Sequence, residues 1–217
     1  MNKSIHATCS ACGAAREVPA WSLVNVREEP QLKEKVRDGS LFLWECPHCG
    51  RTNLARYPLV YHDPDARLMV WMMPDGVLPP AQMDLLEKQL TAQEDALEGY
   101  TLRRVEDVGS LMEKVAVADA GLDDRVVELC KYVMRMEEDG KPSGNLPPEG
   151  AVLRFYRMEG VDNDLVFTYP ADGRIQGLRC GFNVYEDCAG ILRRNPEMTA
   201  GGGFARIDAD WTAKYFK

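Results

Sequence analysis

Four cysteines near the start of the chain have the spacing of a metal site. They form two C-x-x-C pairs, each followed by a glycine: Cys9, Cys12, Cys46 and Cys49. Each pair can present two sulfurs on one tight turn, and two such turns complete a tetrahedral shell of four thiolates. Closed shells of four sulfurs are usually structural zinc sites. The sequence therefore predicts bound zinc with these four cysteines as its ligands.

The residues next to the cysteines favour metal knuckles over disulfide bonds. Gly13 and Gly50 permit the positive φ that suits such a turn, and Pro47 fixes φ directly after Cys46. A disulfide needs an oxidising compartment, and the first residues lack the apolar core of a signal peptide. We therefore expect reduced cysteines and a cytoplasmic protein. The spacer of 33 residues between the pairs exceeds the roughly 15 to 20 of a compact ribbon, so it should contain structure of its own.

The two knuckles and the β-rich run after them resemble the CpXC family of bacterial and archaeal proteins. The resemblance covers roughly the first 130 residues and implies a metal-binding module of uncharacterised activity, with the four cysteines as the motif cysteines. Pro47 matches the family proline of the second motif, whereas Ser10 stands at the corresponding position of the first. The serine weakens the preorganisation of one knuckle but leaves all four ligands in place.

Rubredoxins, which bind iron for electron transfer, share the C-x-x-C-G and C-P-x-C-G knuckles. Two features argue against that resemblance. The residues after Gly13, 14–17, read Ala-Ala-Arg-Glu instead of an aromatic-rich strand, and the chain of 217 residues is much longer than a rubredoxin. Zinc is thus the expected metal and iron the alternative. Identification of the bound metal would decide between them.

Composition places the chain among ordinary water-soluble globular proteins. Hydrophobic residues make up 45% and charged residues 28%, and no run of about 18 apolar residues could span a membrane. The net charge of −8 is uneven, with +2 on residues 1–62 and −10 on the rest. Proteins that bind duplex nucleic acid usually cluster cations to neutralise phosphates. Nucleic-acid binding is therefore disfavoured, with a small surface near Arg51 and Arg56 left open.

The order of predicted elements gives an α+β fold with two parts. Residues 1–78 form a zinc-ribbon-like antiparallel β module, and residues 79–217 form an α+β portion. That portion comprises helices within 82–138, a Pro- and Gly-rich linker at 139–150, and an antiparallel β-meander with flanking helices over 151–217.

Apolar spacing and turn residues give the expected bounds of the single elements. The first part should contain strands at 16–26 and 41–45, a helix at 31–37, and a hairpin of 52–61 with 67–73, which joins the knuckle strands in one small antiparallel sheet. The second part should contain helices at 82–98, 110–121, from 123, 183–194 and from 208, an extended segment at 100–108, and strands at 151–159, 165–169 and 174–180. The helix at 110 is expected because Ser110 and Glu113 have the spacing of a capping box.

Two groups of residues outside the knuckles could do chemistry. Asp124 and Glu128 would share a helix face and could bind a cation or act as acid and base. Acids in a first turn more often cap the helix, and Glu128 can pair with Lys131, so we expect capping.

Cys180 follows a strand and precedes a helix, a position that can lower a thiol pKa. A cysteine hydrolase also needs a base, and all three histidines lie in the first third of the chain: His6, His48 and His62. We therefore expect the other three cysteines to be small buried hydrophobic residues: Cys130, Cys180 and Cys188.

One specific metal signature without a catalytic constellation favours a non-enzymatic binding or regulatory module. A protein partner is the expected kind of ligand, and Trp21 and Trp44 beside the knuckles could form its surface or shield the metal core. Electron transfer through iron and nucleic-acid binding remain the alternatives.

Overall fold

The computed structural model describes residues 2–91, 97–136, 147–148 and 150–216. They form an α+β protein that divides into two compact units, Met1–Met112 (unit 1) and Glu113–Lys217 (unit 2). Among these residues, every helix is too short or too polar to traverse a lipid bilayer.

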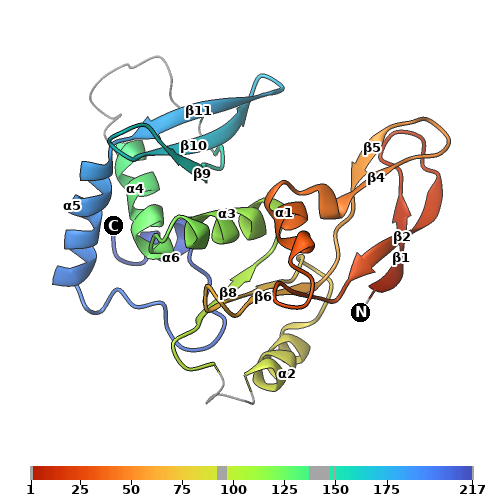
Figure 1. The fold of residues 1–217 in the computed structure, drawn as a ribbon, viewed down its shortest axis with the longest axis horizontal. Helices are drawn as coiled ribbons and strands as arrows, with labels where there is room; N and C mark the ends of the chain where they lie inside the picture. Colours follow the sequence, from red (N-terminus) through yellow and green to blue (C-terminus); the bar gives the residue numbers. More distant parts are fainter. Residues whose placement is uncertain (1, 92–96, 137–146, 149, 217) are drawn as a thin grey trace. The chain divides into compact units, whose positions relative to one another are not determined.

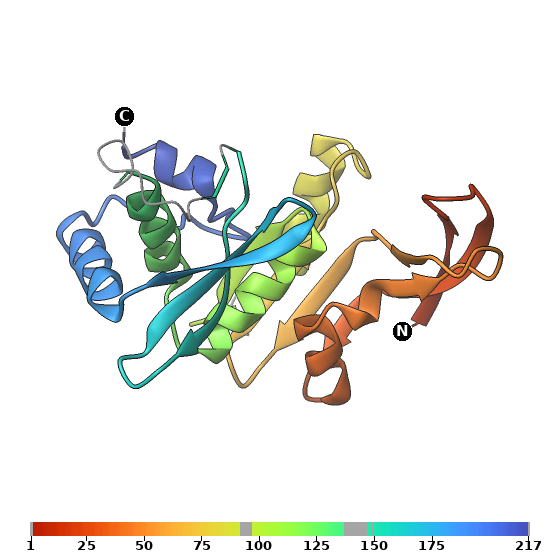
Figure 2. The same cartoon turned by 90° about the horizontal axis from the view of Figure 1, so that it is seen from above.

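Two short antiparallel hairpins in unit 1 each contain one cysteine pair. Strand β1 (Asn2–Thr8) pairs with β2 (Ala15–Trp21), and β4 (Leu43–Glu45) pairs with β5 (Thr52–Leu54). Figures 1 and 2 show the two hairpins side by side. The knuckles lie in the turns that join the strands of each hairpin, and this arrangement brings them together although they are far apart in sequence.

A separate four-stranded sheet forms the centre of unit 1. Its order is β3 (Leu23–Asn25), β6 (Leu59–Asp63), β7 (Leu68–Met72) and β8 (Thr101–Val105). The β6–β7 hairpin is antiparallel as predicted, but β3 and β8 pair parallel to their neighbours. The expectation of one antiparallel sheet that includes the knuckle strands is therefore wrong.

The reason lies in a break within the strand predicted at 16–26. The chain bends at Ser22, so residues before it stay in the knuckle hairpin and residues after it pair with β6. Burial explains why the central sheet forms separately. Val24, Tyr61 and Val70 are each 0% exposed, so three of its strands contribute to one apolar core.

The spacer between the knuckles contains the predicted helix, α1 (Gln31–Arg37), which buries Leu32 and Val36. Residues 41–45, predicted as one strand, instead begin as a 3-10 turn (η1, Ser40–Phe42) before β4. Gly39 at φ 77° starts this turn and accepts a hydrogen bond from the Phe42 amide. The turn buries the side chains of Leu41 and Phe42, which alternation along a strand would place on opposite faces.

Helix α2 (Pro80–Leu90) is shorter than the predicted 82–98, and residues 92–96 lie outside the described part of the chain. Strand β8 lies beyond the predicted boundary at residue 78 and yet belongs to the sheet of unit 1. The two units are compact, but compactness does not show which part of the chain folds independently. A domain boundary after residue 78 therefore stays a prediction, which limited proteolysis would test.

Helix α3 (Val108–Asp119) spans the junction between the units and starts earlier than the predicted capping box requires. The Asp107 carboxylate accepts hydrogen bonds from the amide and hydroxyl of Ser110, at 2.9 and 2.7 Å. Asp107 thus has the capping role expected of Ser110. Glu113, the predicted second member of the box, is free to point elsewhere, and its side chain is buried.

Unit 2 contains the predicted antiparallel meander. Its strands are β9 (Arg154–Glu159), β10 (Asp164–Ala171) and β11 (Arg174–Cys180), in the order β11-β10-β9. Leu165 and Phe167 from the central strand are fully buried. The linker predicted at 139–150 falls mostly outside the described residues.

Three helices complete the described part of unit 2. They are α4 (Asp124–Met136), α5 (Phe182–Arg194) and α6 (Ala209–Ala213), and α4 packs against both others (Figure 2). Helix α6 begins where predicted, because the Asp208 carboxylate caps it by accepting a hydrogen bond from the Trp211 amide.

Candidate metal centre

The two knuckles have nearly the same backbone geometry. The Gly13 amide donates to the Cys9 carbonyl at 3.0 Å, and the Gly50 amide donates to the Cys46 carbonyl at 2.8 Å. The two glycines have φ of 72° and 68°, the left-handed conformation expected for them. Each turn is therefore closed by its own backbone, with a glycine where a side chain would cause strain.

The knuckles bring all four predicted sulfurs together. The Cys9 and Cys49 sulfurs are 3.6 Å apart, as are those of Cys12 and Cys46, and all four lie within 4.8 Å of one another. A regular tetrahedron with zinc–sulfur bonds of about 2.3 Å has sulfur–sulfur edges of about 3.8 Å. The cluster is thus compatible with one metal ion at its centre.

The site has a buried side and an exposed side. Cys9 and Cys46 are 2% and 1% exposed, whereas Cys12 and Cys49 are exposed to solvent. Hydrogen bonds from the backbone of Cys12 and Ala11 lower the pKa of Cys9 to about 6. The Arg51 backbone lowers the pKa of Cys49, but desolvation and the neighbouring thiols outweigh it and raise that pKa to about 12. Of Cys9, Cys12 and Cys49, Cys9 is therefore the cysteine that loses its proton at the lowest pH.

The pKa values of these cysteines predict proton release on metal binding. The pKa of Cys12 is raised like that of Cys49, so both thiols must lose a proton to become ligands. We expect zinc added near pH 7 to release about two or more protons per ion, and the zinc affinity to increase between about pH 6 and 8. A pH indicator in weak buffer measures the release. Magnesium, which prefers oxygen ligands, serves as the control and should release none.

The described histidines lie outside the metal cluster. His6 is exposed and 3.7 Å from the Glu17 carboxylate, and His48 is exposed within the second knuckle. Sequence reasoning did miss one residue at the site, Asn53 of β5. Its side-chain amide lies 3.5 Å from the Cys9 sulfur. An asparagine within the strand predicted at 52–61 is the sequence signal that could have found it, because strands disfavour this residue.

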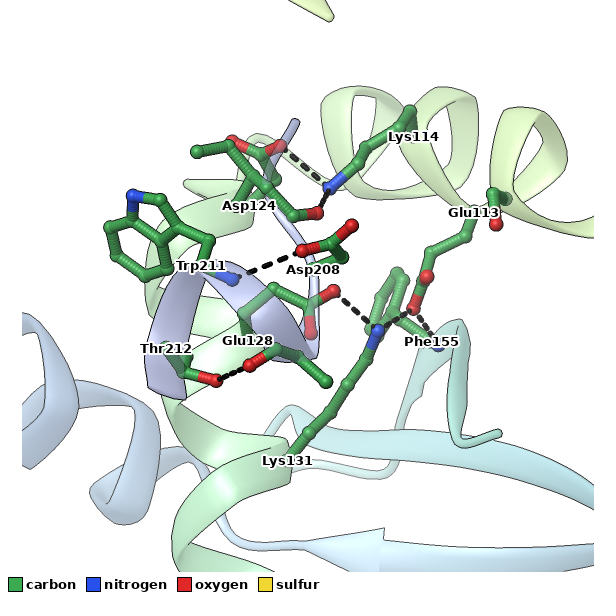
Figure 3. A network of polar contacts seen from close by, with 12 residues as sticks. Glu113, Lys114, Asp124, Glu128, Lys131, Phe155, Asp208, Trp211 and Thr212 are labelled. Atoms are coloured by element: carbon green, nitrogen blue, oxygen red, sulfur yellow. Dashed lines mark hydrogen bonds and ion pairs between the residues drawn. The ribbon is translucent and has the colours of Figure 1, made fainter. Parts of the chain in front are cut away.

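Asp124 and Glu128 of α4 are buried in ion pairs. Lys114 donates to the Asp124 carboxylate at 2.8 Å, and the predicted pair of Lys131 with Glu128 forms at 2.7 Å (Figure 3). The side chains of the two acids are each 7% exposed. The capping expected of Asp124 is instead performed by Asp123, whose carboxylate accepts from the Arg125 amide. The two acids are thus members of a buried network.

Glu113 completes this network, because its carboxylate accepts from both Lys131, at 2.7 Å, and the Phe155 amide (Figure 3). Lys114 also donates to the Ile207 carbonyl at 2.8 Å. The network therefore connects α3 and α4 with β9 and the segment before α6.

The network contains three carboxylates and two ammonium groups, so one carboxylate is in excess. Burial raises the pKa of Glu128, although Lys131 and Lys114 oppose that shift. Burial alone would lower the pKa of Lys131, but Glu113 and Glu128 raise it. Lys131 thus stays charged, and the pKa of Glu128 lies above the usual range of a glutamate.

The three remaining cysteines lie in the core of unit 2. Cys130, Cys180 and Cys188 are 0%, 4% and 1% exposed, as expected of small hydrophobic residues. Cys180 ends β11 as predicted. Hydrogen bonds with Cys180 and Cys188 raise the pKa of Cys130, so Cys130 is a poor nucleophile.

The two tryptophans near the knuckles contribute to one hollow of about 120 Å³. Trp44 is only 9% exposed, and Trp21 is half-buried. Leu43 and Leu54, paired across β4 and β5, are 50% and 45% exposed on the same hairpin. The hollow is lined by residues of β2, α1, η1 and β4 together with Ala55, among them Val18, Pro19, Lys35 and Leu41.

Two adjacent hairpins whose turns bring four cysteines within 4.8 Å of one another are compatible with a metal-binding ribbon. The family model described as CpXC protein matches residues 7–131, more than half of the chain. The chain therefore belongs to the CpXC family. The match includes both knuckles, all strands of unit 1 from β2 onward, and the helices α3 and most of α4. Comparison with curated proteins and with solved structures found no match.

Proposed function

We propose that the four cysteines hold a structural zinc ion and that the protein is a non-enzymatic binding or regulatory module. The observation that carries the proposal is the mutual distance of the four sulfurs, all within 4.8 Å. Four thiolates fill a tetrahedral shell and leave no open position for a water or substrate, unlike catalytic zinc sites. Reduced thiols of this kind suit the cytoplasm, where we place the protein.

Elemental analysis of the protein purified without added metal tests the proposal. We expect one zinc per chain. Iron in that amount, with the red colour of a ferric four-sulfur site, would replace the proposal by electron transfer, because the same ligand set suits both metals. Absence of any transition metal, together with failure to bind added zinc or cobalt, would refute both.

In this proposal the metal stabilises a surface that binds another protein. The support is the hollow lined by Trp21 and Trp44 and the exposed pair Leu43 and Leu54, all on the hairpins that the metal would hold together. Nucleic acid is the less favoured partner because the net charge is −8. A mobility shift that weakens with salt would favour nucleic acid after all, whereas a flat response agrees with a protein partner.

A further inference from the structure

Asn53 lies in the middle of β5, three residues after the second knuckle ends at Gly50, and its side chain is turned toward the first knuckle. It is 7% exposed, whereas its strand neighbours Thr52 and Leu54 are exposed. A buried position in a short strand would ordinarily hold a β-branched or aromatic residue. A polar side chain placed here against that preference indicates a specific role.

The Asn53 amide uses all of its hydrogen-bonding capacity. Its oxygen accepts from the amide and the hydroxyl of Ser10, both at 3.0 Å. Its nitrogen donates to the Arg51 carbonyl at 2.8 Å and to the Cys9 sulfur at 3.5 Å. Two donors and two acceptor positions are the full complement of this side chain, so its orientation is fixed from both ends.

Three of these contacts cross from Asn53 to the first knuckle, and the fourth holds the Asn53 side chain to its own hairpin. Ser10 and Cys9 belong to the first knuckle, while Arg51 and Asn53 follow the second. Ser10 occupies the position that Pro47 has in the second knuckle, and a proline there would have no amide hydrogen to give. The hydrogen bonds between Ser10 and Asn53 thus restrain the first knuckle, as the fixed φ of Pro47 restrains the second.

We propose that Asn53 is a positioning residue of the metal centre, one that fixes the Cys9 sulfur and stabilises its negative charge. The inference rests on the proposed function, because it requires a metal at the four cysteines. An N–H donated to a thiolate is a charge-assisted hydrogen bond. Second partners of this kind orient a ligand, and their loss typically lowers metal affinity about 10- to 100-fold.

The Asn53→Asp variant separates the hydrogen bond to the Cys9 sulfur from the contacts with Ser10. Aspartate has nearly the same shape and keeps oxygens that accept from Ser10. It has no N–H for the Cys9 sulfur or for the Arg51 carbonyl, and it adds a negative charge beside the sulfur. We expect zinc to transfer to a chelator faster, with an affinity lower by about 10- to 100-fold. In the cobalt-loaded protein, the sulfur-to-cobalt absorption bands should shift. Thr52→Ala, on the exposed side of the same strand, is the matched control and should change neither property.

Asn53→Leu removes all four contacts without adding a charge and should also weaken metal binding. If the leucine variant fails to fold, the aspartate variant still decides the matter. An unchanged transfer rate and unchanged cobalt spectrum in Asn53→Asp would overturn the role of Asn53, while metal bound by the unaltered chain would leave the proposed function intact. Failure of the unaltered chain to bind zinc or cobalt would overturn both.

Discussion

Replacing Cys46 with serine is expected to abolish metal binding and to unfold the two knuckle hairpins. Cys46 is 1% exposed, so its sulfur lies on the buried side of the site. In zinc-finger peptides metal binding provides roughly 10 to 16 kcal/mol of folding free energy, as much as the stability of a whole domain. Among the described strand residues of the hairpins, only three apolar side chains are buried to compensate, those of Val18, Ala20 and Trp44.

The measurement is hydrogen exchange of the amides, resolved by peptide, with the metal content determined on the same sample. Strands β1, β2, β4 and β5 should lose protection, whereas the central sheet, with its own core around Tyr61 and Val70, should keep part of it. His48→Ala changes an exposed residue in the same knuckle and should retain the metal and the protection. An unchanged thermal transition and unchanged metal content in Cys46→Ser would contradict the expectation, and a strong chelator should reproduce its effect in the unaltered protein.

The sequence was sufficient to predict the parts of this site that depend on local spacing. Each C-x-x-C-G turn is determined by contacts within six residues, which is why the positive φ at Gly13 and Gly50 and the helix at 31–37 agree with expectation. The meander and α6 were predictable for the same reason, because their turns and the cap at Asp208 are local.

Contacts between distant segments could not be predicted in this way. The parallel pairing of β3 with β6 depends on a bend at Ser22 that no strong turn residue announces. Asn53 contacts Cys9 across 44 positions, and Lys114 reaches the Ile207 carbonyl across 93. From the sequence alone, Glu113 satisfied the pattern of a capping box equally well. Only the tertiary structure shows that its partners are Lys131 of α4 and the Phe155 amide of β9. Periodicity identifies elements, but it does not identify which buried charges will meet.

Replacing Lys131 with methionine is the second change for which we expect a large effect. Its ammonium group donates to both Glu113 and Glu128 at 2.7 Å, and the three side chains are 6–9% exposed. Methionine has a similar length but no charge, so two carboxylates would face each other in the core of unit 2. Removal of one partner from a buried ion pair typically costs about 3 to 5 kcal/mol, because the other charge remains uncompensated. We expect a loss of that size in the free energy of unfolding of unit 2.

The pH dependence of this loss distinguishes electrostatics from packing. The pKa of Glu128 is already raised in the folded protein. A carboxyl group whose pKa is higher in the folded protein than in the unfolded chain stabilises the folded state at pH values below the unfolded pKa. That stabilisation is lost as the pH rises through the folded pKa. Without Lys131 the pKa should rise further, since the ammonium group opposes the shift. The penalty of Lys131→Met should therefore be larger near pH 8 than near pH 5.

Urea denaturation followed by Trp211 fluorescence reports on unit 2, because Trp211 is 3% exposed and the other tryptophans lie in unit 1. Trp21, Trp44 and Trp71 are replaced by phenylalanine in every variant compared, so the signal belongs to one unit. Lys214→Met removes an exposed lysine of the same unit and should stay within about 0.5 kcal/mol. Adding Glu113→Gln and Glu128→Gln to Lys131→Met should recover much of the loss, because neutral amides cost less to bury than unpaired carboxylates. A penalty that is the same at both pH values and is not recovered by the glutamines would show that Lys131 acts through packing of its methylene groups, not through its charge.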